Sequence, residues 1–219
     1  ITLLITGFMG WQARKIEVSY DYAKITPEND PELIYYNQFK KTFGEDGNIF
    51  AIGLQDKSVY SLAKFSRLQK LCADLKKIDG VNDVISLPTL KNLVKDTAKT
   101  KFVQQPIFPE SISTQKELDS LINEAKKVKV YDKLIVNENT NAFLIAVATN
   151  GDYLNSGRRA KMMDEILRLS NQFAEDSKIE LHYAGLPYIR AIMVKEMKSE
   201  LIMLLILSVL VTSGILFLF

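Results

Sequence analysis

The stretch NIFAIGLQDKSVYSLAKFSRLQKLCADLKKIDGVNDVISLP, Asn48–Pro88, decides the fold class of this chain. It opens on NIFAIGLQ, a short apolar run that is typical of a buried strand. From Val59 to Ile78, apolar residues recur at spacings of three and four, which predicts an amphipathic helix that ends at Gly80. The segment GVNDVISLP then predicts a short strand that stops at a Leu-Pro pair.

The same plan returns between Asn141 and Pro187. A hairpin is expected over Lys133–Thr149, a helix over Ser156–Glu175 and a half-buried strand over Lys178–Pro187, again ending in Leu-Pro. Two strand-helix-strand units that share one sheet predict an α+β fold, a ferredoxin-like split βαβ domain with both helices on one face. Such a plan also arises by chance in other α+β domains.

Other elements follow from local signals. An Asn29-Asp30-Pro31 turn precedes a helix that ends at Gly44, and Thr114 with Glu117 matches a capping box at the start of another helix. The Lys- and Thr-rich segment Lys91–Pro109 is predicted to be a connection with at most a little helix.

The C-terminal run from Leu201 to Phe219 carries no charge. Nineteen helical residues would span roughly 28 Å, close to the thickness of a hydrocarbon core. The run therefore predicts a transmembrane helix, with a buried core helix as the alternative. Because no basic or aromatic anchor follows it, the helix is expected to be truncated, with Lys195–Glu200 as its interfacial segment.

The N-terminal run ITLLITGFMGW is apolar but too short to span a bilayer, and Arg14 and Lys15 follow it. We expect residues 1–12 to be the end of a first transmembrane helix, with a short buried segment as the alternative. The predicted organisation is thus a membrane segment at 1–12, an extracytoplasmic porter-like domain at 13–194, and an interfacial and membrane segment at 195–219.

Neither the composition nor the motifs indicate nucleic-acid binding, metal binding or catalysis. A net charge of +2, spread without a basic face, argues against a nucleic-acid partner. Cys72 is the only cysteine, which excludes an intrachain disulfide and a cysteine-based metal site, and it is expected to be a small buried side chain. His182 is the only histidine, and no nucleotide-binding, hydrolase or metalloprotease motif is present. We therefore predict no enzyme activity, no cofactor, no metal and no catalytic residue.

For several groups of residues, the sequence indicates an environment but assigns no function. Carboxylates such as Asp74 and Glu124 lie beside lysines and are expected to be solvated. Glu196 and Glu200 are expected on a wet interfacial helix. Met162, Met163, Met193 and Met197 fit either a core or an apolar partner, and no apolar residue can be assigned to a substrate path.

Three segments carry a resemblance to a known family. They are DYAKITPENDPELIYYNQFKKTFGEDGNIFAIGL, LQKLCADLKKIDGVNDVISL and HYAGLPYIRAIMVKEMKSELIMLLILSVLV. Their shared features are an Asn-Asp-Pro turn before a helix ending Phe-Gly, a Gly-Val-x-x-Val strand, and Ala-Gly-Leu-Pro before a membrane helix. In this order the chain resembles hydrophobe exporters of the RND superfamily, the MMPL-like and Patched-related transporters. SecD/SecF-type subunits fit less well, because their glycine-rich segment has no counterpart here.

The resemblance implies a first periplasmic porter loop in a multi-pass protein of the bacterial inner membrane. Such transporters use ion flux, commonly of protons, through membrane helices to export lipids, drugs or other hydrophobic molecules. The expected partners are the bilayer, a hydrophobic substrate, the remaining transporter helices and a second porter loop, and a homo-oligomer is compatible. The alternatives are a ligand-binding sensor domain between two membrane helices and a structural ectodomain.

Overall fold

The computed structural model describes residues 8–12, 27, 29–43, 46–96, 101–137 and 139–218. The chain divides into two compact units. We call Glu45–Leu154 with Arg158–Ile189 the sheet unit, and Ile1–Gly44 with Asn155–Gly157 and Arg190–Phe219 the terminal unit.

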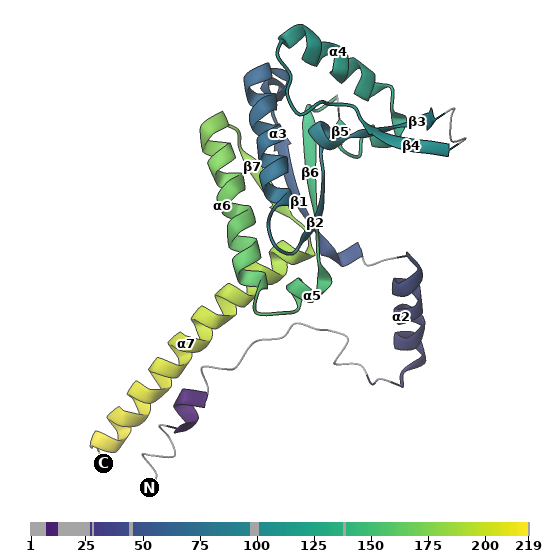
Figure 1. Ribbon diagram of the computed structural model, residues 1–219. Helices are drawn as coiled ribbons and strands as arrows, with labels where there is room; N and C mark the ends of the chain where they lie inside the picture. The colour runs from purple at the N-terminus through teal and green to yellow at the C-terminus, as the bar shows by residue number, and fades with distance from the viewer. Residues whose placement is uncertain are drawn as a thin grey trace. The chain divides into compact units, whose positions relative to one another are not determined.

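The main sheet of the sheet unit is antiparallel, with the strand order β2-β6-β1-β7 (Figure 1). Its central strands pair in register, with Ile52 of β1 opposite Ile145 of β6 and, on the other side, opposite Tyr183 of β7. A short additional strand, β5, pairs with β6 beyond the end of β2. The bounds are β1 (Ile49–Gln55), β2 (Val81–Ile85), β5 (Val136–Asn137), β6 (Ala142–Thr149) and β7 (Leu181–Ala184).

Two long helices, α3 (Leu62–Lys76) and α6 (Arg159–Ser177), lie side by side on one face of this sheet (Figure 1). Each helix links two strands, so β1-α3-β2 and β6-α6-β7 are the two predicted strand-helix-strand units. Alternate residues of β1 and β6 are buried, as a strand with one face on a core requires. The core between sheet and helices includes Phe50, Ile52, Leu54, Phe65, Leu68, Leu75, Ile145, Val147, Met163 and Ile166. The prediction of an α+β protein is confirmed.

The prediction for Lys91–Pro109 was wrong. This segment forms a second, two-stranded antiparallel sheet of β3 (Lys91–Asp96) and β4 (Lys101–Pro106). The apolar residues within the two strands are exposed, so the core-directed periodicity used to recognise strands is weak there. After it comes α4 (Gln115–Lys126), where the Thr114 hydroxyl accepts the Glu117 backbone N–H at 3.2 Å, as the capping box predicted.

Short elements join these larger ones. They are η2 (Asp46–Asn48), η3 (Lys57–Tyr60), η4 (Leu87–Thr89), η5 (Lys129–Tyr131) and α5 (Gly151–Leu154). The turn from β7 into the next helix needs a glycine, because Gly185 has φ +104° and a Cβ there would lie 2.3 Å from the Ile49 carbonyl oxygen.

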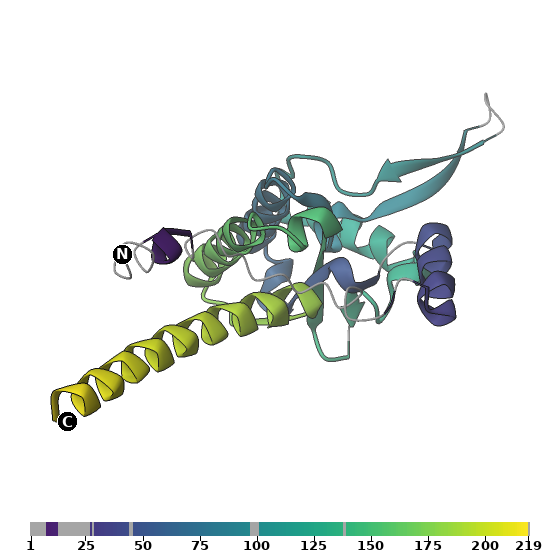
Figure 2. The same cartoon turned by 90° about the horizontal axis from the view of Figure 1, so that it is seen from below.

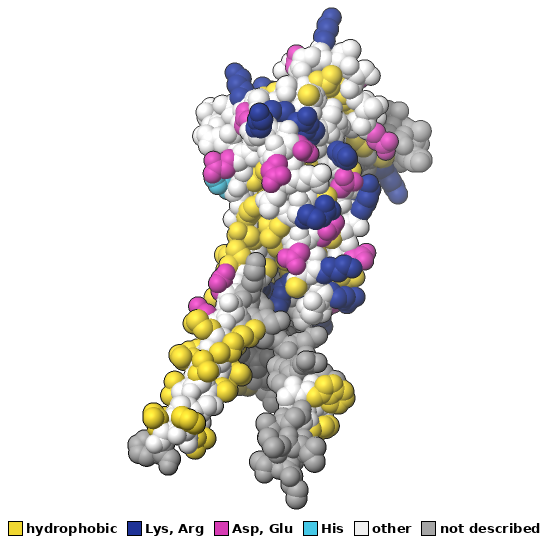
Figure 3. Space-filling view, turned by 90° about the vertical axis from the view of Figure 1, so that its left-hand side faces the viewer, with side chains coloured by type: hydrophobic (Ala, Val, Ile, Leu, Met, Phe, Trp, Pro, Cys, Tyr) yellow, Lys and Arg dark blue, Asp and Glu magenta, His cyan; other side chains and the backbone are white. Residues whose placement is uncertain are grey.

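The helix after Gly185 is α7 (Leu186–Leu218), which runs unbroken for 33 residues. Its segment Ser199–Leu218 is long and apolar enough to cross a membrane, and none of it is buried. Apolar side chains cover this helix in Figure 3. The predicted alternative of a buried core helix is therefore wrong for the described part of this run.

The terminal unit also contains α2 (Pro31–Phe43), whose first turn is capped by the Asp30 carboxylate through the Glu32 backbone N–H at 2.8 Å. The expected first membrane segment at 1–12 lies largely outside the described residues. Only its end, residues 8–12, is described, as a short helical stretch with exposed Phe8 and Trp11.

Candidate functional site

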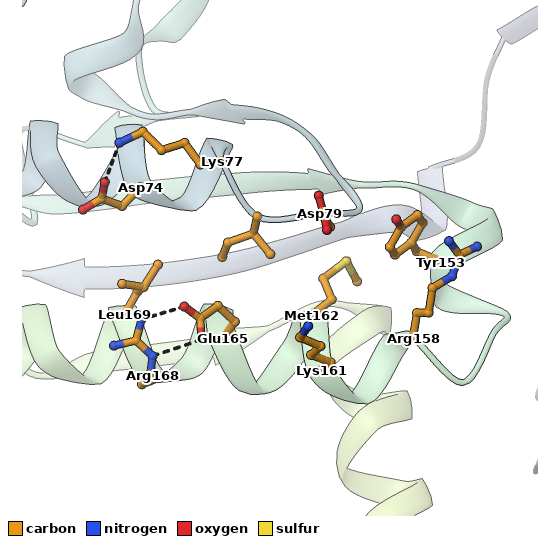
Figure 4. A pocket seen from close by; sticks show the side chains of 11 residues that line it. Asp74, Lys77, Asp79, Tyr153, Arg158, Lys161, Met162, Glu165, Arg168 and Leu169 are labelled. Carbon is orange, nitrogen blue, oxygen red and sulfur yellow. Dashed lines mark hydrogen bonds and ion pairs between the residues drawn. The ribbon is translucent and has the colours of Figure 1, made fainter.

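A hollow of about 660 Å³ opens between the C-terminal part of α3 and the first half of α6 (Figure 4). Hollows of this size are typical of small-molecule sites. Its lining comes from α3, the turn after α3, α5 and α6. The lining residues are Asp74, Lys77, Ile78, Asp79, Tyr153, Arg158, Lys161, Met162, Glu165, Arg168 and Leu169.

The floor of the hollow is apolar. Met162 is 2% exposed, and Ile78 and Leu169 are half-buried. Met162 and Leu169 lie seven residues apart on the same side of α6, and Ile78 follows the end of α3. Ile78 and Leu169 therefore keep apolar surface that a ligand in the hollow can contact.

The rim of the hollow is charged. On the α3 side, Lys77 Nζ lies 2.9 Å from Asp74 Oδ1. On the α6 side, the Arg168 guanidinium donates to both carboxylate oxygens of Glu165, from Nη2 to Oε1 at 2.6 Å and from Nε to Oε2 at 3.0 Å. These hydrogen bonds hold the pKa of Glu165 below and that of Arg168 above their ordinary values.

The end of the hollow is closed by the turn after α3. Gly80 has φ +92°, and a Cβ there would come within 2.5 Å of the Tyr153 ring and 2.7 Å of the Met162 sulfur. The Gly80 carbonyl oxygen accepts the Asn150 backbone N–H at 2.7 Å, which ties this turn to the end of β6. The Arg158 guanidinium stacks on the Tyr153 ring, 4.1 Å from its centroid.

A second hollow of about 250 Å³ shares Asp74 and Leu169 with the first and continues along the two helices. Arg67 of α3 donates to the Asp176 carbonyl of α6 across it. We call the two hollows together the helix groove. Figure 3 shows acidic and basic side chains interleaved over the α3 and α6 face.

The helix groove has the chemistry of a binding site for an amphipathic molecule. Four cations and three carboxylates line the larger hollow above an apolar floor, a net charge of +1. An apolar portion can contact the floor while a polar or anionic head lies among the charged side chains.

Cys72 and His182, the two residues that the sequence analysis weighed for reactive chemistry, lie outside the helix groove. Cys72 is buried at 2% exposure, and burial raises the pKa of its thiol to about 12, as expected for a core residue. His182 is exposed on β7, on the sheet face opposite the helices. Within the described residues, no group of three His, Cys, Asp or Glu is arranged to hold a metal ion.

The structure separates the methionines that the sequence left open. Met162 and Met163 are buried in the sheet unit, whereas Met193 and Met197 are 48% and 43% exposed on α7. Glu196 and Glu200 are exposed on α7, as expected for a solvated segment. Sequence reasoning missed the helix groove because its charged residues look like ordinary solvated helix faces. The feature that could have indicated it is that both predicted long helices carry a charged face and were expected on the same side of the sheet.

Comparison with protein-family models and with curated proteins found no match for this chain.

Proposed function

We propose that this chain is the first porter loop and flanking membrane segments of an RND-type transporter, which exports lipids or other hydrophobic molecules. In this proposal the region 13–194 is periplasmic, the protein is a multi-pass component of the bacterial inner membrane, and ion flux through other helices drives export. The chain binds the cargo and rearranges during export, and it catalyses no covalent reaction.

The fold supports this proposal through its strand order. In β2-β6-β1-β7, the two strands that begin the strand-helix-strand units are central and adjacent, and both helices cover one face. That is the arrangement of the ferredoxin-like split βαβ domain to which we assign the sheet unit.

The observation that carries the proposal is the continuity of α7. Its first turn belongs to the sheet unit, where the Tyr188 ring packs on Phe50 at 5.7 Å between centroids. The same helix continues without a break into the candidate membrane span Ser199–Leu218. One helix thus links the edge of the folded sheet to the bilayer, as a pump that couples membrane events to a porter domain requires.

The helix groove is the proposed contact for cargo within the sheet unit. Its floor of Ile78, Met162 and Leu169 suits an acyl chain or another apolar group, and its charged rim suits a polar head.

A transport measurement tests the proposal. The full-length protein is reconstituted into proteoliposomes, and the movement of a fluorescent phospholipid is followed with and without a proton gradient. Leu169→Glu places a charge on the groove floor and should lower gradient-driven transport at least tenfold. Val130→Glu makes the same change at a site that is 76% exposed and outside the groove, and should stay within twofold of wild type.

Thermal unfolding of both variants separates loss of binding from loss of fold. Transport that does not depend on the gradient would contradict the proposal. So would ligand binding to the groove without any transport, which is the result expected of a sensor domain.

A further inference from the structure

The ribbon formed by β3 and β4 exposes four apolar side chains. Leu93 is 64% exposed, Val94 42%, Phe102 71% and Val103 47%. Val94 lies directly opposite Val103 on one face. On the other face, Leu93 pairs with Gln104 and Phe102 pairs with Lys95, which makes Leu93 and Phe102 diagonal neighbours. Both faces of the ribbon therefore carry an unburied apolar pair.

The base of the ribbon is anchored in the core. Leu90 and Ile107 are 2% and 6% exposed, and the Ile107 N–H donates to the Leu90 carbonyl at 3.0 Å. Phe108 packs on Phe65 of α3, with 5.0 Å between ring centroids. Apolar residues of the same segment thus change from buried to exposed where the ribbon starts.

The ribbon reaches away from the main sheet of its unit in both views (Figures 1 and 2). A lone two-stranded ribbon is marginally stable in water, and apolar side chains exposed on both faces add no stability. Contact with an apolar surface would remove these side chains from water and so stabilise the ribbon.

The charge of the ribbon indicates what that surface is. Its two strands contain three lysines, Lys91, Lys95 and Lys101, against one aspartate, a net charge of +2. All three lysines are exposed. Lysines on a strand edge disfavour pairing with another strand, and a like-charged second copy is repelled. Lysines beside exposed apolar side chains are instead the pattern that binds anionic lipid surfaces.

We propose that the β3–β4 ribbon docks on an anionic lipid surface. Leu93, Val94, Phe102 and Val103 enter the boundary between headgroups and acyl chains, and the three lysines contact lipid phosphates. Insertion of about 5–10 Å leaves the outer backbone groups of the ribbon in the hydrated headgroup layer, where water satisfies them. The inference rests on the ribbon alone and does not require the transport function.

The test uses the full chain held in phosphatidylcholine nanodiscs, so that α7 is already inserted in a neutral bilayer. Vesicles of phosphatidylcholine with one-third phosphatidylglycerol are added, and binding is measured by co-sedimentation. Binding to these vesicles, weakened by salt and much reduced for pure phosphatidylcholine vesicles, is the expected result.

Two sets of variants assign the binding to the ribbon. Replacing the three ribbon lysines by Gln should lower the affinity about 100-fold, since each lysine near an anionic surface contributes roughly fivefold. The control replaces three exposed lysines outside both the ribbon and the helix groove, Lys57, Lys116 and Lys133, and should lower it much less.

For the apolar part, F102S/V103S should lower the affinity at least tenfold. V130S/L134S removes two other exposed apolar side chains, 76% and 63% exposed, and should stay within twofold. Equal binding by the ribbon variants and wild type would overturn the proposal. A second contrary result would be a dimer of wild type, seen by sedimentation, that F102S/V103S does not form. That result would identify the ribbon as an interface between copies of the chain and would overturn the proposal.

Discussion

The turn at Gly185 is predicted to be among the least replaceable positions of the sheet unit. In Gly185→Ala, the backbone at φ +104° costs about 1–3 kcal/mol for a residue with a side chain. The new Cβ would lie 2.3 Å from the Ile49 carbonyl oxygen, so β1 and β7 must move apart, at a further cost of about 1–3 kcal/mol. We expect a total loss of about 4 kcal/mol, a large part of the stability of an ordinary domain.

The assay is urea unfolding of the full chain in nonionic detergent, followed by circular dichroism, with hydrogen exchange of β1 and β7 as a local readout. Gly53→Ala is the matched control, because it lies in β1 and a Cβ there would meet nothing nearer than the His182 carbonyl oxygen at 3.8 Å. It should change the free energy of unfolding by less than about 1 kcal/mol.

Cys72→Ala is a second control, and it removes one buried sulfur at a cost of about 1 kcal/mol. A valine at position 185 should be worse than alanine, because its branched Cβ adds contacts in the same tight space. Equal stability of Gly185→Ala and Gly53→Ala would refute the reasoning from the turn.

Three further predictions concern stability and folding. Burial raises the pKa of the Cys72 thiol from an ordinary value of 9.0 to about 12, so the folded chain keeps this proton at a pH where the unfolded chain loses it. The contribution of Cys72 to stability should be constant below about pH 9 and fall by about 1.4 kcal/mol per pH unit between about pH 9 and pH 12. In alkaline urea titrations, wild type should lose stability more steeply than Cys72→Ala by this slope. Thr114→Ala should cost about 1 kcal/mol in the same assay while Thr114→Ser keeps most of the cap, and equal losses would exclude a capping role for the hydroxyl. The isolated fragment from Ile16 to Ile192 should be soluble, cooperative in unfolding and without enzymatic activity, and an aggregated or unfolded fragment would contradict the assignment of one domain.

Much of the main sheet was predictable because its strands and helices bury one regular face. β1, α3 and β2 follow from the Asn48–Pro88 pattern, since apolar residues at a spacing of two or of three and four identify elements that pack on a core. The cap at Thr114 was predictable for a local reason, because it depends on residues three positions apart. The ribbon of β3 and β4 was missed because neither strand buries a face in the core. Its main contact is the pairing of the two strands with each other.

The candidate site depended on tertiary structure. Asp74 and Glu165 each have a basic neighbour three residues away on the same helix, which looks like an ordinary solvated surface in the sequence. Only the packing of α3 beside α6 brings these ion pairs to opposite sides of one hollow and leaves Met162 at its floor.

Local sequence determined the long helices, the strands that pack on the core and the helix that is apolar enough for a membrane, because periodicity and hydrophobicity act through neighbours along the chain. The strand order β2-β6-β1-β7, the close approach of Gly185 to Ile49 and the helix groove were decided by contacts between residues that lie far apart along the chain. Such contacts depend on how buried faces fit together in space, and a single sequence does not contain that fit in any local pattern.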